Sequence, residues 1–458
     1  MSSQRLNSVR RTAPGRISRR SFLKLAGAVG AGAGLAACGP AGRIPATENG
    51  TIQLVYQDGR EAWYLPVIQR MLDEFHSSHP HIQVYYSSEP EGTRSKEEVM
   101  LAEMQAGNAP DVFQGCCSWF PIWAQKGYTL DLRPFIEADL DRATIEDWDP
   151  AQYKGLATSD GLQYGLPKYH GALALYYNKD LFDRYKVSYP DGSWDHADYL
   201  EAMKRLTRDR DRDGEIDLWG SQTYITWDRI QMHVNGWGGH LIDPQNPRRV
   251  MFAEPEALAA QEWLRERMWS DRVMATTLDV QDLWPDDAFI AGKIAMLEDG
   301  SWRLKHILTN APFRVGVAPF PSGPVRKVTL ATTDGFGIYA GTKYPEAAWE
   351  LVKFLTGKQF GRALAQDGFL QPARASLVEE WAGFIRAEFP DKTGEMDIEA
   401  FADGHRNGYS VVSEVAANMA EATWHSNAAW DQIFTLGQAP VTLLQETARK
   451  IETAMAAP

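Results

Sequence analysis

The sequence predicts an α/β protein with more than one domain, and three observations support this prediction. The chain has 458 residues, which is more than one hydrophobic core normally organises. Residues 51–113 alternate between strand-like and helix-like hydrophobic patterns. A short apolar run at 172–177 follows a Gly-Leu-Pro turn and leads directly into a helical pattern. Such alternation is typical of a parallel sheet with helices on its faces.

The first part of the chain predicts a β-α-β-α-β order. The expected elements are strands at 51–56 and 82–86, helices at 64–75 and 96–105, and a return to a strand within 107–113. In an open sheet of this kind, ligands bind outside the carboxyl ends of the strands. The loops at 57–60 and 114–119 are therefore expected near a binding site.

The middle of the chain continues the same alternation. The run at 172–177 predicts a buried strand, and Asn178 is expected to cap the next helix because its side chain can accept a bond from an orphan N–H. A further helix is expected at 199–206, with Ser193 as its cap. A strand near 314–321 and a helix at 346–355 follow.

Composition excludes some partners. The formal charge is −13, and the first 38 residues hold seven basic residues and no acidic one, so the remainder carries −20. Such an acidic chain is not expected to bind nucleic acid or an anionic membrane surface. The chain also has 16 tryptophans, which is many for its length. Most should lie in the core, and a few are available for ligand stacking.

The N-terminus has the features of an export address. Ser-Arg-Arg-Ser-Phe-Leu-Lys at 18–24 resembles a twin-arginine signal, and an Ala/Gly-rich run follows it. Leu-Ala-Ala-Cys at 35–38 resembles a lipobox, which implies that Cys38 becomes the lipidated N-terminus. Residues 1–38 are thus expected to form the signal, and 39–50 a flexible tether.

The other two cysteines, Cys116 and Cys117, are adjacent. Ordinary disulfides join Cα atoms that lie farther apart than neighbours do, so a bond here requires a strained ring. The sequence therefore favours two small buried thiols. A vicinal disulfide in an oxidising compartment is the alternative.

Residues 164–187 read YGLPKYHGALALYYNKDLFDRYKV. This stretch resembles the crossover of extracellular solute-binding proteins, the receptor subunits of ABC importers, in the carbohydrate-binding branch that includes maltose-binding protein. Further resembling phrases are AGNAPDVF at 106–113, GKIAM at 292–296, GSW at 300–302, TTDGFG at 332–337 and GFLQP at 368–372. The resemblance covers nearly all of the chain after residue 50.

The resemblance implies a two-lobed periplasmic-binding-protein fold. Two open α/β sheets would be joined by a three-segment hinge, with the ligand cleft between them. Residues 51–168 and 330–369 would form lobe 1, and residues 169–329 and 370–458 would form lobe 2. The implied function is non-enzymatic. The protein would capture a sugar reversibly by lobe closure, with an oligosaccharide as the favoured class of sugar. It would then deliver this ligand to membrane permease subunits.

The implied protein is a monomer that needs no cofactor, and its lipid is its only membrane anchor. Three alternatives stay open. One is an exported carbohydrate-active hydrolase, although the sequence has no HExxH, GxSxG or P-loop motif. The second is a receptor for another solute, such as a glycerol phosphate, which the small number of Arg and Lys residues in the expected cleft loops disfavours. The third is a sugar-binding adhesin or sensor subunit.

Aromatic faces can stack on a sugar ring, and carboxylates or Arg can bond its hydroxyls. Trp302 leads the candidates because it matches the tryptophan of the family's GSW phrase. His170 alone does not indicate a metal site, because no other histidine lies at ligand spacing from it. The candidate ligand-binding residues are Asp58, Arg60, Trp119, Tyr169, His170, Trp227, Trp237, Trp302, Asp334 and Gly335.

An acidic loop at 209–217 begins like an EF-hand, in which alternate carboxylates converge on a hard cation. Its candidate calcium ligands are Asp209, Asp211, Asp213, Glu215 and Asp217. The loop departs from the pattern at position twelve, where Gly220 replaces the bidentate glutamate. Structural calcium and a solvated acidic turn are both compatible with this sequence.

Overall fold

The computed structural model describes residues 50–59, 64–88, 96–117, 119–281, 283–332 and 334–456. The predictions for the signal, the tether, Cys38 and Arg60 lie outside these residues. In the described part of the chain, no helix is both long and apolar enough to cross a membrane.

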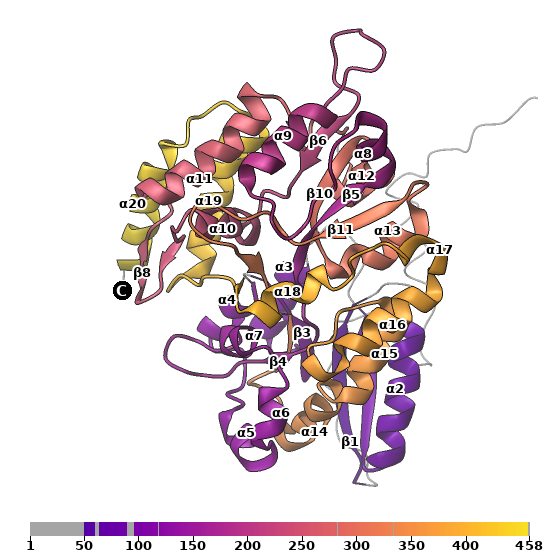
Figure 1. Ribbon diagram of the computed structural model, residues 1–458. Coiled ribbons are helices and arrows are strands. Elements are labelled where there is room, and N and C mark those ends of the chain that lie inside the picture. Colours follow the sequence, from indigo (N-terminus) through magenta and orange to yellow (C-terminus); the bar gives the residue numbers. More distant parts are fainter. Residues whose placement is uncertain are drawn as a thin grey trace, which may run out of the picture. The chain divides into compact units, whose positions relative to one another are not determined.

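Two five-stranded sheets organise these residues, and Figure 1 shows them as separate groups of arrows. The first has the order β2 (Ile82–Ser88), β1 (Ile52–Asp58), β3 (Val112–Gly115), β13 (Gly335–Ile338), β4 (Leu166–Pro167). The second has the order β11 (Val315–Ala318), β5 (Leu173–Asn178), β10 (Ile294–Gly300), β6 (Trp219–Gln222), β9 (Met274–Ala275). Two small sheets pair β12 (Thr329–Leu330) with β14 (Ser410–Val411) and β7 (Ile242–Asp243) with β8 (Asn246–Val250).

Helices surround both sheets. They are α2 (Tyr64–Ser78), α3 (Lys96–Ala106), α4 (Trp119–Gln125), α5 (Arg133–Asp139), α6 (Arg142–Glu146), α7 (Pro150–Gly155), α8 (Lys179–Tyr185), α9 (His196–Leu206), α10 (Trp227–Gly236), α11 (Pro255–Arg265), α12 (Pro285–Ile290), α13 (Leu304–Asn310), α14 (Pro345–Leu355), α15 (Lys358–Gly368), α16 (Val378–Glu388), α17 (Pro390–Thr393), α18 (Ala400–Asn407), α19 (Met419–Trp430) and α20 (Leu443–Ala456).

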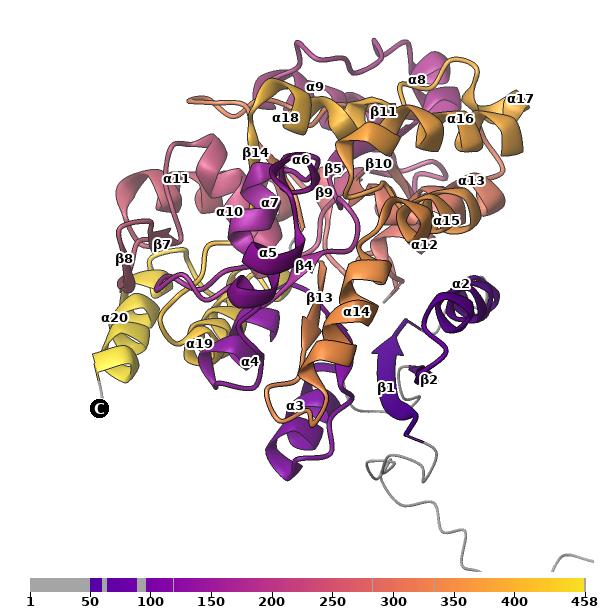
Figure 2. The ribbon, with the colours of Figure 1, turned by 90° about the horizontal axis from the view of Figure 1, so that it is seen from below.

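The first sheet confirms the predicted β-α-β-α-β start. β1 pairs in parallel with both β2 and β3. The sheet is mixed, however, because β13 re-enters from the second half of the chain and runs antiparallel to β3 and β4. Helix α14 packs along β13 (Figure 2), and its face of Ala348, Leu351, Val352 and Leu355 is buried as its spacing predicts.

The second sheet is centred on β5 and β10, which pair antiparallel. Asn178 ends β5 and caps α8 as predicted, because its side chain accepts a bond from Leu181 N at 3.1 Å. The prediction that Ser193 caps the next helix is wrong. Helix α9 begins only at His196, so the cap is Asp195, which accepts bonds from Ala197 N and Asp198 N.

Three chain segments lie side by side where the chain passes between the two sheets. Tyr169 bridges Pro372, and Ala172 bridges Ala331. Gln152 of α7 joins two of these segments, since its Nε2 donates to both Tyr169 O and Thr332 O at 2.7 Å. The predicted fold class, two open α/β sheets with a three-segment hinge, is therefore confirmed.

The C-terminal helices contact both halves of this arrangement. Trp430 and Phe434 share one hydrophobic cluster with Trp123 of α4. Gln125 at the end of α4 donates to Ala416 O at 2.7 Å and accepts from Met419 N at 3.2 Å. These contacts connect the start of α19 with the first sheet's helices.

Candidate ligand-binding site

Two adjoining cavities lie beside the hinge. Compartment A, of about 570 Å³, is lined by Asp58, Tyr64, Trp119 and Lys168 on one side and by Arg303, Lys305 and His306 of the second lobe on the other. Compartment B, of about 410 Å³, is lined by Cys117 and Thr332 and by residues 224–229, Thr423 and Asn427.

Four residues, Cys116, Tyr169, Trp302 and Asp334, line both compartments. The two compartments therefore adjoin at these residues and form one cleft. Asp58 ends β1 and Cys116 follows β3, so the cleft opens at the carboxyl ends of parallel strands, as predicted.

Trp302 is held at the centre of this cleft by close packing. A Cβ atom at Gly300 or Gly171 would collide with the Trp302 ring, so the two glycines make room for the indole. The ring also lies 5.5 Å from the guanidinium of Arg229, within cation–π distance. Trp302 therefore lines both compartments, and its contact with a ligand remains a prediction.

Arg229 is a site residue that sequence reasoning missed. It lies on α10 and lines compartment B, and its guanidinium is 3.4 Å from Asp299 Oδ1. Its buried Nε atom has no hydrogen-bond partner among the described residues, and the same holds for Thr332 Oγ1 in the same compartment. A buried polar atom without a partner costs free energy, so a ligand hydroxyl that reached either atom would form a favourable hydrogen bond.

Asp299 supplies a test by pH. Burial raises the pKa of Asp299 to about 6, against the opposing effect of Arg229 and Arg303. Between pH 4 and 6 the folded protein thus keeps a proton that the unfolded chain releases, so this group's contribution makes stability fall as pH rises.

The side chain of the Asp299→Asn variant does not titrate. The substitution should therefore remove a decrease of about 3 kcal/mol in the free energy of unfolding as the pH rises from 4 to 6. Urea unfolding from pH 4 to 7 measures it for both proteins. If the free energy of unfolding changed with pH equally in the variant and the parent, the raised pKa of Asp299 would be contradicted.

Asp58 carries a buried ion pair. Its side chain is fully buried, and Lys168 Nζ lies 2.5 Å from its Oδ1. The hydroxyls of Tyr56 and Tyr64 donate to the other carboxylate oxygen, and Gly59 N donates to Oδ1 at 2.7 Å. Asp58 therefore fixes the floor of compartment A and positions Lys168 there.

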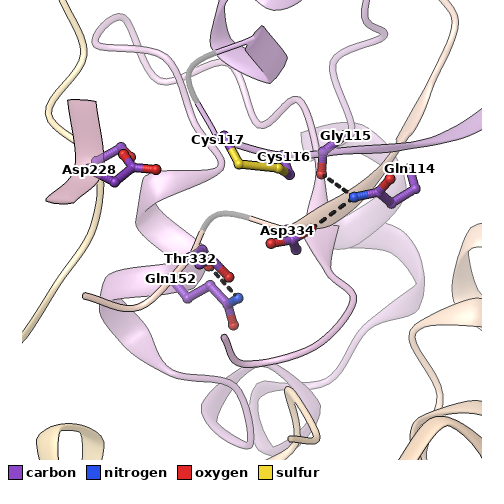
Figure 3. The surroundings of a disulfide bond; sticks show 9 residues. Gln114, Gly115, Cys116, Cys117, Gln152, Asp228, Thr332 and Asp334 are labelled. Carbon is purple, nitrogen blue, oxygen red and sulfur yellow. Dashed lines mark hydrogen bonds between the residues drawn. A yellow bond between two sulfur atoms is a disulfide. The ribbon is translucent and has the colours of Figure 1, made fainter. Parts of the chain in front are cut away.

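The adjacent cysteines form a disulfide, which corrects the expectation of two buried thiols. Both residues are half-buried, because the chain leaves the buried strand β3 here and meets the cleft. Figure 3 shows the disulfide between Asp228 of α10 and the pair formed by Gln114 and Asp334, whose side chains are 2.8 Å apart.

His170 has partners that its sequence neighbourhood does not reveal. Asp149 Oδ2 lies 3.1 Å from His170 Nε2 and 2.6 Å from His405 Nδ1, so the reasoning that His170 stands alone is wrong. Burial would raise the pKa of Asp149, but the hydrogen bonds with His170 and His405 outweigh it and hold that pKa well below its ordinary value. The fold brings together residues more than 200 positions apart, and His170 lines neither compartment described above.

Of the remaining candidate residues, one lines the cleft and the others pack in the surrounding structure. Trp227 lines compartment B but is buried, and its Nε1 donates to Glu414 O at 2.9 Å. Trp237 packs against His196 and Trp263 and lines neither described compartment. Gly335 lies inside β13, where a Cβ atom would meet Leu166 O and Leu156.

The small number of Arg and Lys residues in the expected cleft loops does not extend to the whole cleft. Lys168, Arg303, Lys305 and His306 all line compartment A. Sequence reasoning missed three of them because Arg303, directly before α13, and Lys305 and His306 on α13 enter the cleft from the second lobe. Their charges are partly compensated: Lys168 pairs with Asp58, His306 lies 3.1 Å from Asp287, and Lys305 Nζ donates to Asp367 O.

The loop at 209–217 brings three of its five candidate ligands together. Carboxylate oxygens of Asp209, Asp211 and Asp217 lie within 4.8 Å of one another, and all three residues are exposed. Gly220 cannot be a glutamate, since a Cβ atom there would collide with the backbone of Met203.

Calcium remains a prediction for this loop. Adding millimolar calcium after chelation should raise the melting temperature if the carboxylates converge on the ion. Asp211→Asn should reduce the shift. An unchanged melting temperature would favour a solvated turn.

With this geometry established, comparison with known proteins identifies the family. Residues 60–361 match the model of bacterial extracellular solute-binding proteins. The chain belongs to this family. It is therefore a binding protein rather than an enzyme, as predicted. Residues 16–36 match the twin-arginine translocation signal, so this solute-binding protein is exported.

The chain is 23% identical to a maltotriose-binding protein of Pyrococcus abyssi over 73% of this chain and 69% of that one. Its fold is similar to that of an ABC substrate-binding protein from Listeria monocytogenes in complex with cycloalternan. There the TM-score is 0.77 and the identity 22%, over 89% of this chain and 100% of that one. A maltose/maltodextrin-binding domain from Bdellovibrio bacteriovorus bound to maltotriose gives a TM-score of 0.69 at 18% identity, over 88% and 99% of the two chains.

Proposed function

We propose that this solute-binding protein captures an oligosaccharide reversibly between its lobes and delivers it to the membrane permease subunits of an ABC importer. The observation that carries the proposal is the cleft shared by Trp302, Tyr169 and Asp334. An indole and a phenol can stack on the apolar faces of sugar rings, while Asp334 and Arg229 bond the hydroxyls.

The number of adjoining cavities favours several sugar units over one. Compartment B shares Tyr224, Ile225 and Thr226 with a further cavity of about 380 Å³, which Trp284 and Phe434 also line. Trp284 is 65% exposed there, and its ring lies 6.3 Å from that of Tyr224. Three adjoining cavities with aromatic residues suit a chain of rings, and the relatives named for maltotriose and solved with cycloalternan support gluco-oligosaccharides.

A thermal-shift screen of the purified protein tests this proposal. The panel holds monosaccharides, maltotriose and other oligosaccharides, glycerol phosphates and amino acids. A ligand at a hundred times its dissociation constant stabilises the fold by about 2.7 kcal/mol. A shift with an oligosaccharide that is recovered intact is the expected result, and silence across all sugars would contradict it.

The basic residues of compartment A favour one second candidate, an anionic solute such as a glycerol phosphate. Lys168, Arg303 and Lys305 could contact a phosphate there. Their existing partners, Asp58 among them, weaken this candidate because a phosphate would have to displace them or share them. A larger shift with glycerol phosphates than with any sugar would decide in its favour.

The lipobox supports membrane anchoring through Cys38, with no other membrane contact. Cys38→Ser should leave the exported protein unlipidated and released from the membrane fraction. Fractionation of cells with an antibody against the protein measures this, and Cys116→Ser is the matched control that keeps the lipobox. Normal anchoring of the Cys38 variant would contradict the assignment.

A further inference from the structure

We propose that the Cys116–Cys117 disulfide is itself a ligand-contacting surface, an apolar platform against which one sugar ring packs where the two compartments meet. This inference rests on the proposed oligosaccharide function and deepens it. Its first support is position: Cys116 lines both compartments, and Cys117 lines compartment B.

The second support is the backbone at the disulfide. Cys117 has φ of +56°, in the left-handed region that non-glycine residues rarely adopt. Such residues persist where the surroundings hold them, and they cluster at ligand sites. Here the bonded pair turns the chain between the end of β3 and α4, so both sulfurs stay at the cleft instead of joining the core.

The third support is the chemistry around the disulfide. Two bonded sulfurs offer a polarisable, apolar surface with no hydrogen-bond donor. Polar groups surround it: Figure 3 shows Asp228, Asp334 and Thr332 near the pair. Thr332 is buried, and its Oγ1 has no partner among the described residues.

This arrangement suits a sugar ring, whose apolar C–H face can lie on the sulfurs while its rim of hydroxyls reaches the polar groups. Thr332 Oγ1 and Arg229 Nε would then gain partners. A flat aromatic ligand would satisfy the sulfurs but leave these polar atoms unpaired, so the platform selects for sugars.

Reduction provides the test because it removes the platform without mutation. A dithiol reductant transfers two electrons and two protons: the sulfur–sulfur bond breaks, two Cys S–H groups form, and the dithiol becomes a cyclic disulfide. In the full-length Cys38→Ser protein these are the only two cysteines, so no other thiol responds. Mass spectrometry after alkylation counts the free thiols in each state.

The probe is maltotriose, or the oligosaccharide of the thermal-shift panel that stabilises the protein most. The oxidised protein should bind it about three- to tenfold more tightly than the reduced protein. By linkage, saturating sugar should make the disulfide harder to reduce by the same factor. Cys116→Ala/Cys117→Gly, which supplies a glycine at the left-handed position, should bind like the reduced protein.

Each outcome decides a different claim. Equal affinity of the oxidised and reduced proteins, or two free thiols in protein exposed to oxidant, would overturn the platform and leave the proposed function standing. An oxidised protein that binds no oligosaccharide of the panel would overturn the proposed function, and the platform with it.

Discussion

Asp58→Ala should lower the free energy of unfolding by about 3–5 kcal/mol, the usual cost of breaking a buried ion pair from one side. The substitution leaves the ammonium of Lys168, which is 6% exposed, without its carboxylate. It also removes the acceptor for the hydroxyls of Tyr56 and Tyr64. Urea unfolding at neutral pH measures the change.

The matched control for this prediction removes both charges. Asp58→Ala combined with Lys168→Met should be less destabilised than Asp58→Ala alone, because no uncompensated charge remains buried. A loss below about 1 kcal/mol for the single variant would show that water or another group satisfies Lys168. A double variant that is less stable than the single one would also contradict the account.

Trp302→Ala should weaken oligosaccharide binding by about 1–3 kcal/mol, the scale found when an aromatic side chain that stacks on a nucleic-acid base is removed. The expected loss is large because Trp302 lines both compartments and its ring is positioned by Gly171, Gly300 and Arg229. Titration calorimetry with the best oligosaccharide of the panel measures the affinity.

Trp424→Ala is the control for this prediction, since Trp424 is 74% exposed and lines neither compartment. It should bind like the parent protein. Melting temperatures of both variants separate a folding defect from a lost contact. An unchanged affinity for Trp302→Ala in a folded protein would remove Trp302 from the site.

Local patterns predicted most of the fold. The cap at Asn178, the buried face of α14 and the alternation up to β3 all follow from spacing that one segment contains. The antiparallel entry of β13 does not follow from spacing, because strand direction depends on the path of the chain through the hinge.

Residues of the candidate site could be predicted only where a short sequence motif contains them. Trp302 is part of the short GSW motif and was predicted as a candidate. Arg229 is hidden inside an amphipathic helix and is distinguished only by its contacts with Asp299 and Trp302. His405 reaches Asp149 from 256 residues away, a pairing that no local pattern encodes. The cysteine pair was visible, but its bonded state depends on the turn at the end of β3.

The most direct test of the central claim is titration calorimetry of the oxidised protein with maltotriose and the other oligosaccharides of the panel, followed by analysis of the recovered sugar. We expect saturable binding of one oligosaccharide per chain, with the ligand released chemically intact on unfolding. Heat from hydrolysis with shortened products, or tight binding of glycerol phosphate without any binding of sugar, would contradict it.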